Sequence, residues 1–116
     1  MTTIEGNKLI AGFDDSVKLT NERTYKYLIR GQRWAAEGLK YHSSWDWLMP
    51  VVGKIESQGQ SVSIFRGCCD IRFDKLEEWQ EEHETIESGG GQPKIVSVWQ
   101  SVVKYIQWYN QQNPIQ

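Results

Sequence analysis

The clearest hydrophobic pattern of the chain lies in the segment KIVSVWQSVVKYIQWYNQQN. Apolar residues recur there at helical spacing and form a broad stripe: Ile95, Val98, Trp99, Val102, Ile106 and Tyr109. The spacing predicts a helix over residues 94–110. A helix that is apolar over so wide an arc must be buried against a sheet or a partner.

A second helix is predicted over residues 44–58, within and after the stretch YHSSWDWLMPVV. Its apolar residues again repeat at helical spacing: Leu48, Val51, Val52 and Ile55. Ser43 or Ser44 is a suitable N-cap, and Asp46 suits the positive end of the helix dipole. Pro50 removes one backbone hydrogen bond, so we expect the helix either to kink there or to begin nearer Pro50.

Alternating patterns predict strands in two further regions. TYKYLI alternates its aromatic residues from Thr24 to Ile29, with Gly31 as a turn and a second strand around Leu39 to Tyr41. SVSIFRGCCDIRF alternates in the same way, with Gly67 as a hairpin turn or a bulge and Cys69 facing inward. We also expect a short amphipathic helix near the start, in NKLIAGF, and an acidic helix in DKLEEWQEEHETIE, residues 74–87.

These elements predict an α+β fold in a single domain, residues 1–116. A small antiparallel sheet of about three to five strands would be built from residues 24–41 and 61–74. The helices over 44–58 and 94–110 would pack on one face of it, with the short N-terminal helix added.

Charge is distributed unevenly along the chain. The net charge is −2 and the sequence pI about 5.7, which disfavours a general nucleic-acid binder because phosphates need a basic face. Residues 18–40 nevertheless carry six basic and two acidic side chains, whereas residues 74–87 carry seven acidic side chains and one lysine. If the two patches lie on different faces, the molecule is a dipole that steers a charged partner or pairs with itself.

Neither a signal peptide nor a membrane anchor is predicted, because no long apolar run is present. The two cysteines, Cys68 and Cys69, are adjacent, so the disulfide framework of a small secreted domain is missing. We therefore expect a cytoplasmic protein without a membrane partner.

The segments NKLIAGF, LKYHSSWDWLMPVVGKIES and KIVSVWQSVVKYIQWYN carry a resemblance to a known family. With them the chain resembles small proteins of Bacteroidetes-type bacteria, their phages and mobile elements. The resemblance covers about half of the residues, and it departs at Gly53, where family members often carry an acidic residue. It implies a phage or prophage accessory protein, with tasks such as inhibition of a host defence system, and it implies no catalytic role.

Three groups of residues are candidates for function. His42 and Asp46 stand four apart, as a general base and the carboxylate that orients it would on one helix face. Aromatic and basic residues interleave as in proteins that stack and hold nucleotides: Tyr25, Tyr27, Arg30, Arg33, Trp34 and Tyr41. The acidic segment offers a surface that mimics nucleic acid to a partner, with Glu77, Glu78, Glu81 and Glu82. Each group also has a purely structural explanation, as a helix entry, a half-buried sheet and a solvated helix face.

The sequence favours a non-enzymatic accessory protein that acts by binding, as an inhibitor or adaptor of a host protein. The alternative is a protein that sequesters a nucleotide or another small ligand in a basic aromatic pocket. A small hydrolase that uses His42 and Asp46 ranks last. We expect a protein partner, no cofactor and no metal site, and a homodimer is suggested by the wide apolar helix and the charge asymmetry.

Overall fold

The computed structural model describes residues 2–65, 68–73, 85–88 and 93–112. Within these residues the predicted α+β class and the N-terminal helix are confirmed, and the strands form two antiparallel sheets instead of one. The helices are α1 (Thr3–Phe13), α2 (Trp45–Ser57) and α3 (Lys94–Gln112), with a short 3₁₀ turn, η1 (Ala36–Gly38). The strands are β1 (Val17–Leu19), β2 (Tyr27–Ile29), β3 (Gln32–Trp34), β4 (Gln60–Phe65), β5 (Cys68–Phe73) and β6 (Thr85–Ser88).

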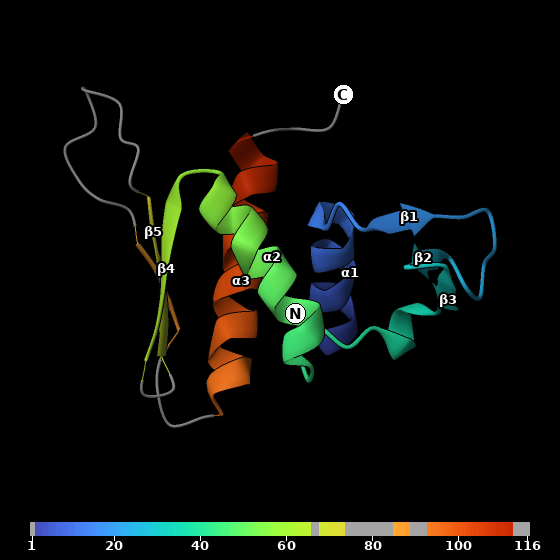
Figure 1. Ribbon diagram of the computed structural model, residues 1–116, viewed down its shortest axis with the longest axis horizontal. Coiled ribbons are helices and arrows are strands. Elements are labelled where there is room, and N and C mark those ends of the chain that lie inside the picture. Colours follow the sequence, from blue (N-terminus) through green and yellow to red (C-terminus); the bar gives the residue numbers. More distant parts are fainter. Residues whose placement is uncertain (1, 66–67, 74–84, 89–92, 113–116) are drawn as a thin grey trace.

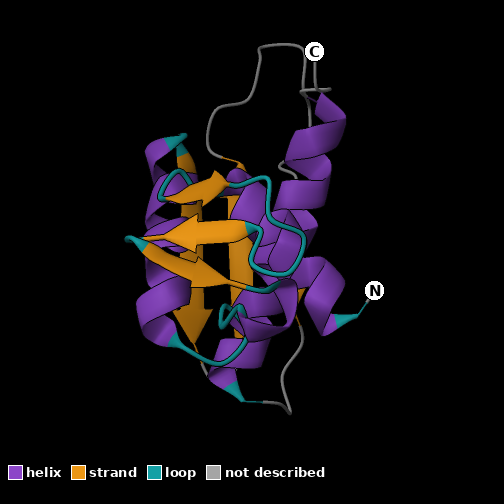
Figure 2. Cartoon of the chain, turned by 90° about the vertical axis from the view of Figure 1, so that its right-hand side faces the viewer, coloured by secondary structure: helices purple, strands orange, loops and turns teal. Residues whose placement is uncertain are grey.

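The two sheets lie on opposite sides of the helices. Figure 1 shows α2 and α3 against one face of the β4–β5–β6 sheet, and α1 between these helices and the β1–β2–β3 sheet. In Figure 2 the small β1–β2–β3 sheet lies in front of the helices and the other sheet behind them. Both sheets therefore bury one face against the same helical layer, which holds most of the core.

The two principal helices lie close to their predicted positions. Helix α2 begins after the N-cap Ser44, whose side chain makes no capping hydrogen bond, and it continues through Pro50. The predicted apolar stripe of α2 is buried in full: Leu48, Val51, Val52 and Ile55. In α3 the side chains of Val98, Val102 and Ile106 are completely buried, as the broad stripe requires.

The first hairpin differs from the prediction in its second strand. Arg30 and Gly31 both adopt positive φ, 51° and 81°, and Ile29 pairs with Gln32 across them. This is the two-residue type I′ geometry, whose twist matches that of paired strands. The second strand therefore follows at once as β3, and the predicted strand around Leu39 to Tyr41 is wrong. Leu39 and Tyr41 are buried as that pattern suggested, but in irregular backbone beside η1.

The second sheet confirms the strand prediction and corrects the acidic helix. Strands β4 and β5 are antiparallel, and Cys69 and Ile71 of β5 are completely buried, with Cys69 inward as predicted. Residues 85–87, predicted as the end of a helix, belong to β6, where Ile86 pairs with Ile71. The backbone hydrogen bonds of this segment are made with β5, and the helical spacing of its apolar residues could not indicate that pairing. The rest of the predicted acidic helix, and the question of Gly67, lie outside the described residues.

Lys54 of α2 holds the C-terminal end of α1. Its Nζ atom donates to the carbonyl oxygen of Phe13 and forms an ion pair with Asp15, at 2.9 Å from Oδ1. It also lies 4.1 Å from the centre of the Phe13 ring. A cation is favourable at this end of a helix, where backbone carbonyls have no helical partner, so the contact joins α2 to α1.

Helices α1 and α3 pack closely at Gly6. A methyl group added to Gly6 would overlap the Trp99 ring, lying 2.7 Å from its Cη2 atom, and would stand 3.2 Å from Cγ2 of Val103. Real Cβ atoms do not come this close to a ring, so α1 can pack here only without a side chain. Gly12, in the same helix, has open space where its Cβ would be.

We predict opposite effects of one substitution at these two glycines. Gly6→Ala should lower the free energy of unfolding by about 1–3 kcal/mol, because it forces α1 away from Trp99. Gly12→Ala should raise it by up to about 1 kcal/mol, since alanine has the better helix propensity and meets no neighbour. Urea denaturation of both variants measures the two effects, and equal stabilities would contradict the close packing of α1 on α3.

Candidate functional site

A buried asparagine connects three distant segments of the chain. Asn7 of α1 is 1% exposed, and its Nδ2 atom donates to the Leu39 carbonyl oxygen at 3.1 Å. Its Oδ1 atom accepts a hydrogen bond from Nε1 of Trp99 in α3 at 2.8 Å. Nδ2 also lies 2.9 Å from Nδ1 of His42. All the hydrogen-bonding atoms of this amide therefore have partners.

The partners of Asn7 determine the role of His42. The Trp99 indole can only donate, so Oδ1 of Asn7 must face it and the amide nitrogen must face His42. Nδ1 of His42 is then an acceptor, and the ring proton is on Nε2. A carboxylate that orients a catalytic histidine accepts a hydrogen bond from one ring nitrogen and leaves the other free to act as the base, whereas the unprotonated nitrogen here, Nδ1, is already bonded to Asn7.

The structure does not bring His42 and Asp46 together as a catalytic pair. No hydrogen bond joins the two side chains within the described part of the chain, and Asp46 is exposed at the start of α2. His42 instead precedes the helix as a partly buried residue held by Asn7. His42 therefore has the structural role, just before a helix, that the sequence allowed as the alternative to catalysis.

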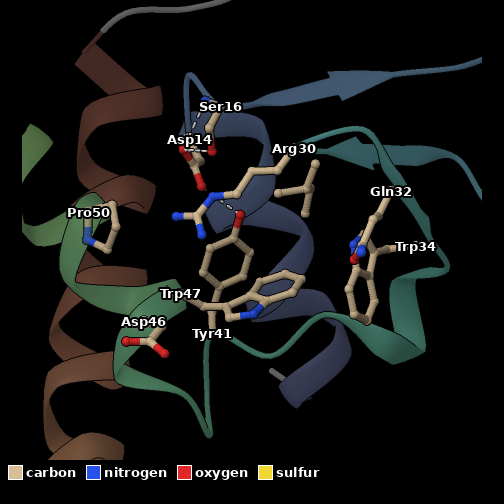
Figure 3. Close-up of a pocket in the computed structure, with 10 residues that line it drawn as sticks. Asp14, Ser16, Arg30, Gln32, Trp34, Tyr41, Asp46, Trp47 and Pro50 are labelled. Atoms are coloured by element: carbon tan, nitrogen blue, oxygen red, sulfur yellow. Dashed lines mark hydrogen bonds between the residues drawn. The ribbon is translucent and has the colours of Figure 1, made fainter.

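A cleft of about 120 Å³ lies between the first hairpin and α2, and Asp46 is on its wall. Figure 3 shows its side chains converging from the end of α1, the turn between β2 and β3, the segment before α2, and α2 itself. The lining residues are Asp14, Ser16, Ile29, Arg30, Gln32, Trp34, Tyr41, Asp46, Trp47 and Pro50.

One wall of the cleft is a fixed hydrogen-bonded group around Asp14. The Tyr41 hydroxyl donates to Oδ2 of Asp14 at 2.8 Å. Oδ1 of the same carboxylate accepts from the backbone nitrogen and the hydroxyl of Ser16, at 3.0 and 2.9 Å. Burial raises the pKa of Tyr41 far above its ordinary value, and the charge of Asp14 and the hydrogen bond to it raise this pKa further. Tyr41 is therefore a permanent donor here and not a base.

The other wall is aromatic. The Trp47 ring meets Trp34 at 5.0 Å and Tyr41 at 5.3 Å between ring centres, in both cases nearly perpendicular. The Nζ atom of Lys40 lies 5.3 Å from the centre of the Trp34 ring. Edge-to-face contacts of this kind hold the rings in fixed orientations, so the aromatic wall is ordered without a ligand.

The predicted ligand-binding residues separate into different places. Arg30, Trp34 and Tyr41 line the cleft together, and Arg30 extends across it in Figure 3. Tyr27 lines a second hollow, which shares no lining residue with the cleft. The remaining two are on the outside: Arg33 forms an ion pair with Glu22, and Tyr25 is 50% exposed. The six residues therefore do not line one pocket.

Other predicted features can be placed only in part. Cys69 is buried, and burial raises the pKa of its thiol, which disfavours the reactive thiolate. No three histidine, cysteine or acidic side chains of the described residues gather closely enough to hold a metal ion. The four glutamates proposed to bind a partner, Glu77, Glu78, Glu81 and Glu82, lie outside the described residues.

Sequence reasoning missed Asn7, Asp14 and Trp47. Asn7 carried a usable signal, because it stands on the same face of α1 as Ile10 and Ala11, where a polar side chain needs buried partners. Asp14 had no such signal, since its role depends on Tyr41, which is 27 residues away.

Comparison with protein-family models, curated proteins and solved structures found no match. In the part of the chain that the structure describes, none of the helices combines the length and the apolar character that crossing a membrane requires. Any functional assignment must therefore rest on the residues themselves.

Removing the Asn7 amide should be costly. Asn7→Leu keeps a side chain of similar size but leaves the Leu39 carbonyl, His42 and the Trp99 indole without their partner. We expect a loss of about 2–5 kcal/mol in the free energy of unfolding, since each orphaned buried group costs roughly 1–3 kcal/mol. His42→Ala removes one of the three contacts and should cost less. Thermal denaturation followed by circular dichroism measures both, and a stable Asn7→Leu variant would contradict the structural role of the amide.

Stability should also depend on Tyr41 at alkaline pH. The pKa of Tyr41 is raised in the folded state above its ordinary value of 10.0. Below pH 10.0 the contribution of Tyr41 to the free energy of unfolding is therefore complete. Above that pH the unfolded chain ionises first, and the contribution is lost as the pH rises. Tyr41→Phe should therefore lose less stability than the wild type between about pH 9 and pH 11. At neutral pH the same variant should be roughly 1.5–3 kcal/mol less stable, because the hydrogen bond to a carboxylate is gone.

Denaturant titrations at several pH values test this, with Tyr25→Phe, an exposed tyrosine, as the matched control. Parallel pH profiles of the wild type and Tyr41→Phe would refute the assignment.

Proposed function

We propose that this protein acts by binding a partner protein, without catalysis, as an inhibitor or adaptor of the kind that phages and mobile elements encode. The partner docks on the outer face of α2, at the mouth of the cleft. It inserts one basic side chain between Asp46 and the aromatic wall.

The observation that carries this proposal is a pair of exposed apolar side chains on α2, each next in the sequence to a residue that lines the cleft. Trp45 and Met49 are 39% and 43% exposed. They stand four residues apart on α2 and are therefore neighbours on its surface. Asp46 and Pro50, the next residue in each case, line the cleft. Isolated exposed apolar residues are common, but an exposed tryptophan and methionine that are neighbours on one helix surface are typical of binding surfaces.

The size of the cleft favours a single inserted side chain. Small-molecule sites generally have volumes of about 300–1,000 Å³, whereas this cleft has about 120 Å³. A nucleotide is too large for it, but one side chain of a partner is not. Anchors of this kind, in a pocket near the centre of an interface, carry much of the energy of protein association.

The lining favours a basic side chain. Two carboxylates, Asp14 and Asp46, and three aromatic rings face the cleft, and the rings attract cations through their faces. Arg30 opposes such a guest, but its side chain is exposed and makes no ion pair within the described residues, so it is able to turn toward solvent.

The non-enzymatic part of the proposal is supported by how the reactive groups are used. Nδ1 of His42 accepts from Asn7, the Cys69 thiol is buried, and Tyr41 donates to Asp14. Catalysis of the hydrolase type needs a nucleophile and a base within reach of each other. These three residues do not provide such a pair. Val98, Val102 and Ile106 of the α3 stripe are buried inside the chain, which removes part of the reason to expect a homodimer.

Replacing the exposed pair should abolish partner capture. We expect Trp45→Ser combined with Met49→Ser to weaken binding by about thirtyfold or more, the effect of losing one hot-spot contact. The experiment is affinity capture from host lysate at low salt, with the retained protein identified and its affinity then measured in purified form. Asp46→Asn should weaken the same interaction by a smaller factor.

The matched control is Ile4→Ser combined with Leu19→Ser, which removes two exposed apolar side chains away from the cleft. One identified protein retained by the wild type and the control, and lost from the α2 variant, supports the proposal. Equal capture by all three proteins, or no protein above background, counts against it.

A further inference from the structure

A second hollow, of about 440 Å³, lies beside the start of β2 and is separate from the cleft. Three separate segments form it: α1, the chain from Arg23 to the start of β2, and η1. Its lining residues are Lys8, Arg23, Thr24, Lys26, Tyr27, Ala36 and Glu37. Its volume falls within the range of about 300–1,000 Å³ that is usual for small-molecule sites.

Hydrogen bonds around Thr20 hold the segment that carries two of the cations. The backbone nitrogen of Thr20 donates to the Lys26 carbonyl at 2.7 Å, and its hydroxyl donates to the Tyr25 carbonyl at 3.1 Å. The hydroxyl also accepts from the backbone nitrogen of Glu22 at 3.2 Å. The connection between β1 and β2, at the far right of Figure 1, is thus tied across its base. Arg23 and Lys26 are presented from an ordered turn.

The charges around the hollow are not balanced. Three of the lining residues are basic, and Glu37 is the acidic one. Oε1 of the nearby Glu22 lies 3.3 Å from Nε of Arg33, so this carboxylate is already paired with another cation. Within the described residues, Lys8, Arg23 and Lys26 form no ion pair, which leaves the hollow with an excess of positive charge. Like charges brought together without partners destabilise a fold, and a bound anion relieves this repulsion.

We propose that this hollow binds a small organic phosphate of nucleotide size, with Lys8, Arg23 and Lys26 around the phosphate groups. Arginine and lysine hold phosphate by charge-assisted hydrogen bonds, and arginine does so with two parallel donors. Four of the seven lining residues are charged, so a purely apolar ligand does not fit. A nucleic-acid polymer is disfavoured, because a polymer needs an extended basic face, whereas this hollow holds three cations in a chain with a net charge of −2.

This site is independent of the proposed partner surface. It shares no lining residue with the cleft, and neither Trp45 nor Met49 borders it. It also differs from the aromatic set that the sequence suggested for a nucleotide, since Tyr27 is the one residue common to both.

Isothermal titration calorimetry at low ionic strength tests the site with three probes: inorganic pyrophosphate, ATP and adenosine. Pyrophosphate and ATP should bind, and adenosine, which has no phosphate, should not. Raising the salt concentration should weaken both interactions, because the contacts are ionic.

Variants then locate the binding. Arg23→Ser combined with Lys26→Ser should weaken ATP binding by about tenfold or more, since two charge-assisted contacts are lost. Glu37→Gln should strengthen it by removing the opposing carboxylate. Lys18→Ser, an exposed lysine of β1 outside the hollow, is the matched control and should bind as the wild type does. Thermal denaturation verifies that each variant is folded.

Three results would overturn the inference. The first is the absence of binding for both pyrophosphate and ATP, and the second is equal ATP affinity in the wild type and the double variant. The third is an affinity for single-stranded oligonucleotides that increases with their length and exceeds that for ATP, which would identify a polymer ligand. None of these results depends on the outcome of partner capture.

Discussion

The hydrogen bonds of Asn7 are the constraint on which the rest of the structure depends. They join α1 to α3 through Trp99 and to the chain before α2 through Leu39 and His42. A polar amide in a core is tolerated only when its partners are all present, so the three segments must come together in one arrangement. The bare backbone at Gly6, one residue away, lets the Trp99 ring approach closely enough to reach the amide.

The other end of α1 positions the cleft. Asp14 directly follows the helix and holds Tyr41, while Lys54 binds the Phe13 carbonyl and Asp15 from α2. Through these contacts α1 determines how the Tyr41 and Trp47 rings stand against the first hairpin. The short helix near the N-terminus therefore links the first sheet to both principal helices (Figure 1), although its own apolar stripe is modest.

Prediction from sequence succeeded where burial follows a regular period. The two principal helices were placed within about two residues at each end, because their apolar stripes face one continuous core. It failed where pairing decides the structure. Leu39 and Tyr41 are buried without being a strand, and Ile86 is in a strand because Ile71 is its neighbour. The division into two sheets has the same origin, since alternation shows that a segment is extended but not which strand it pairs with.

The candidate site was harder to predict than the fold for a related reason. A single motif, YHSSWDWLMPVV, supplied Tyr41, Asp46, Trp47 and Pro50 to the cleft, so it does contribute to a site. The residues opposite, Asp14 and Arg30, come from segments whose approach no local pattern records. The hydrogen bond between Asn7 and Trp99 spans 92 positions of the sequence, which also bears on how the chain folds. Asn7 lies in α1 and Trp99 in α3, so during synthesis this bond cannot form until α3 has been made, and the contact between the two helices closes late.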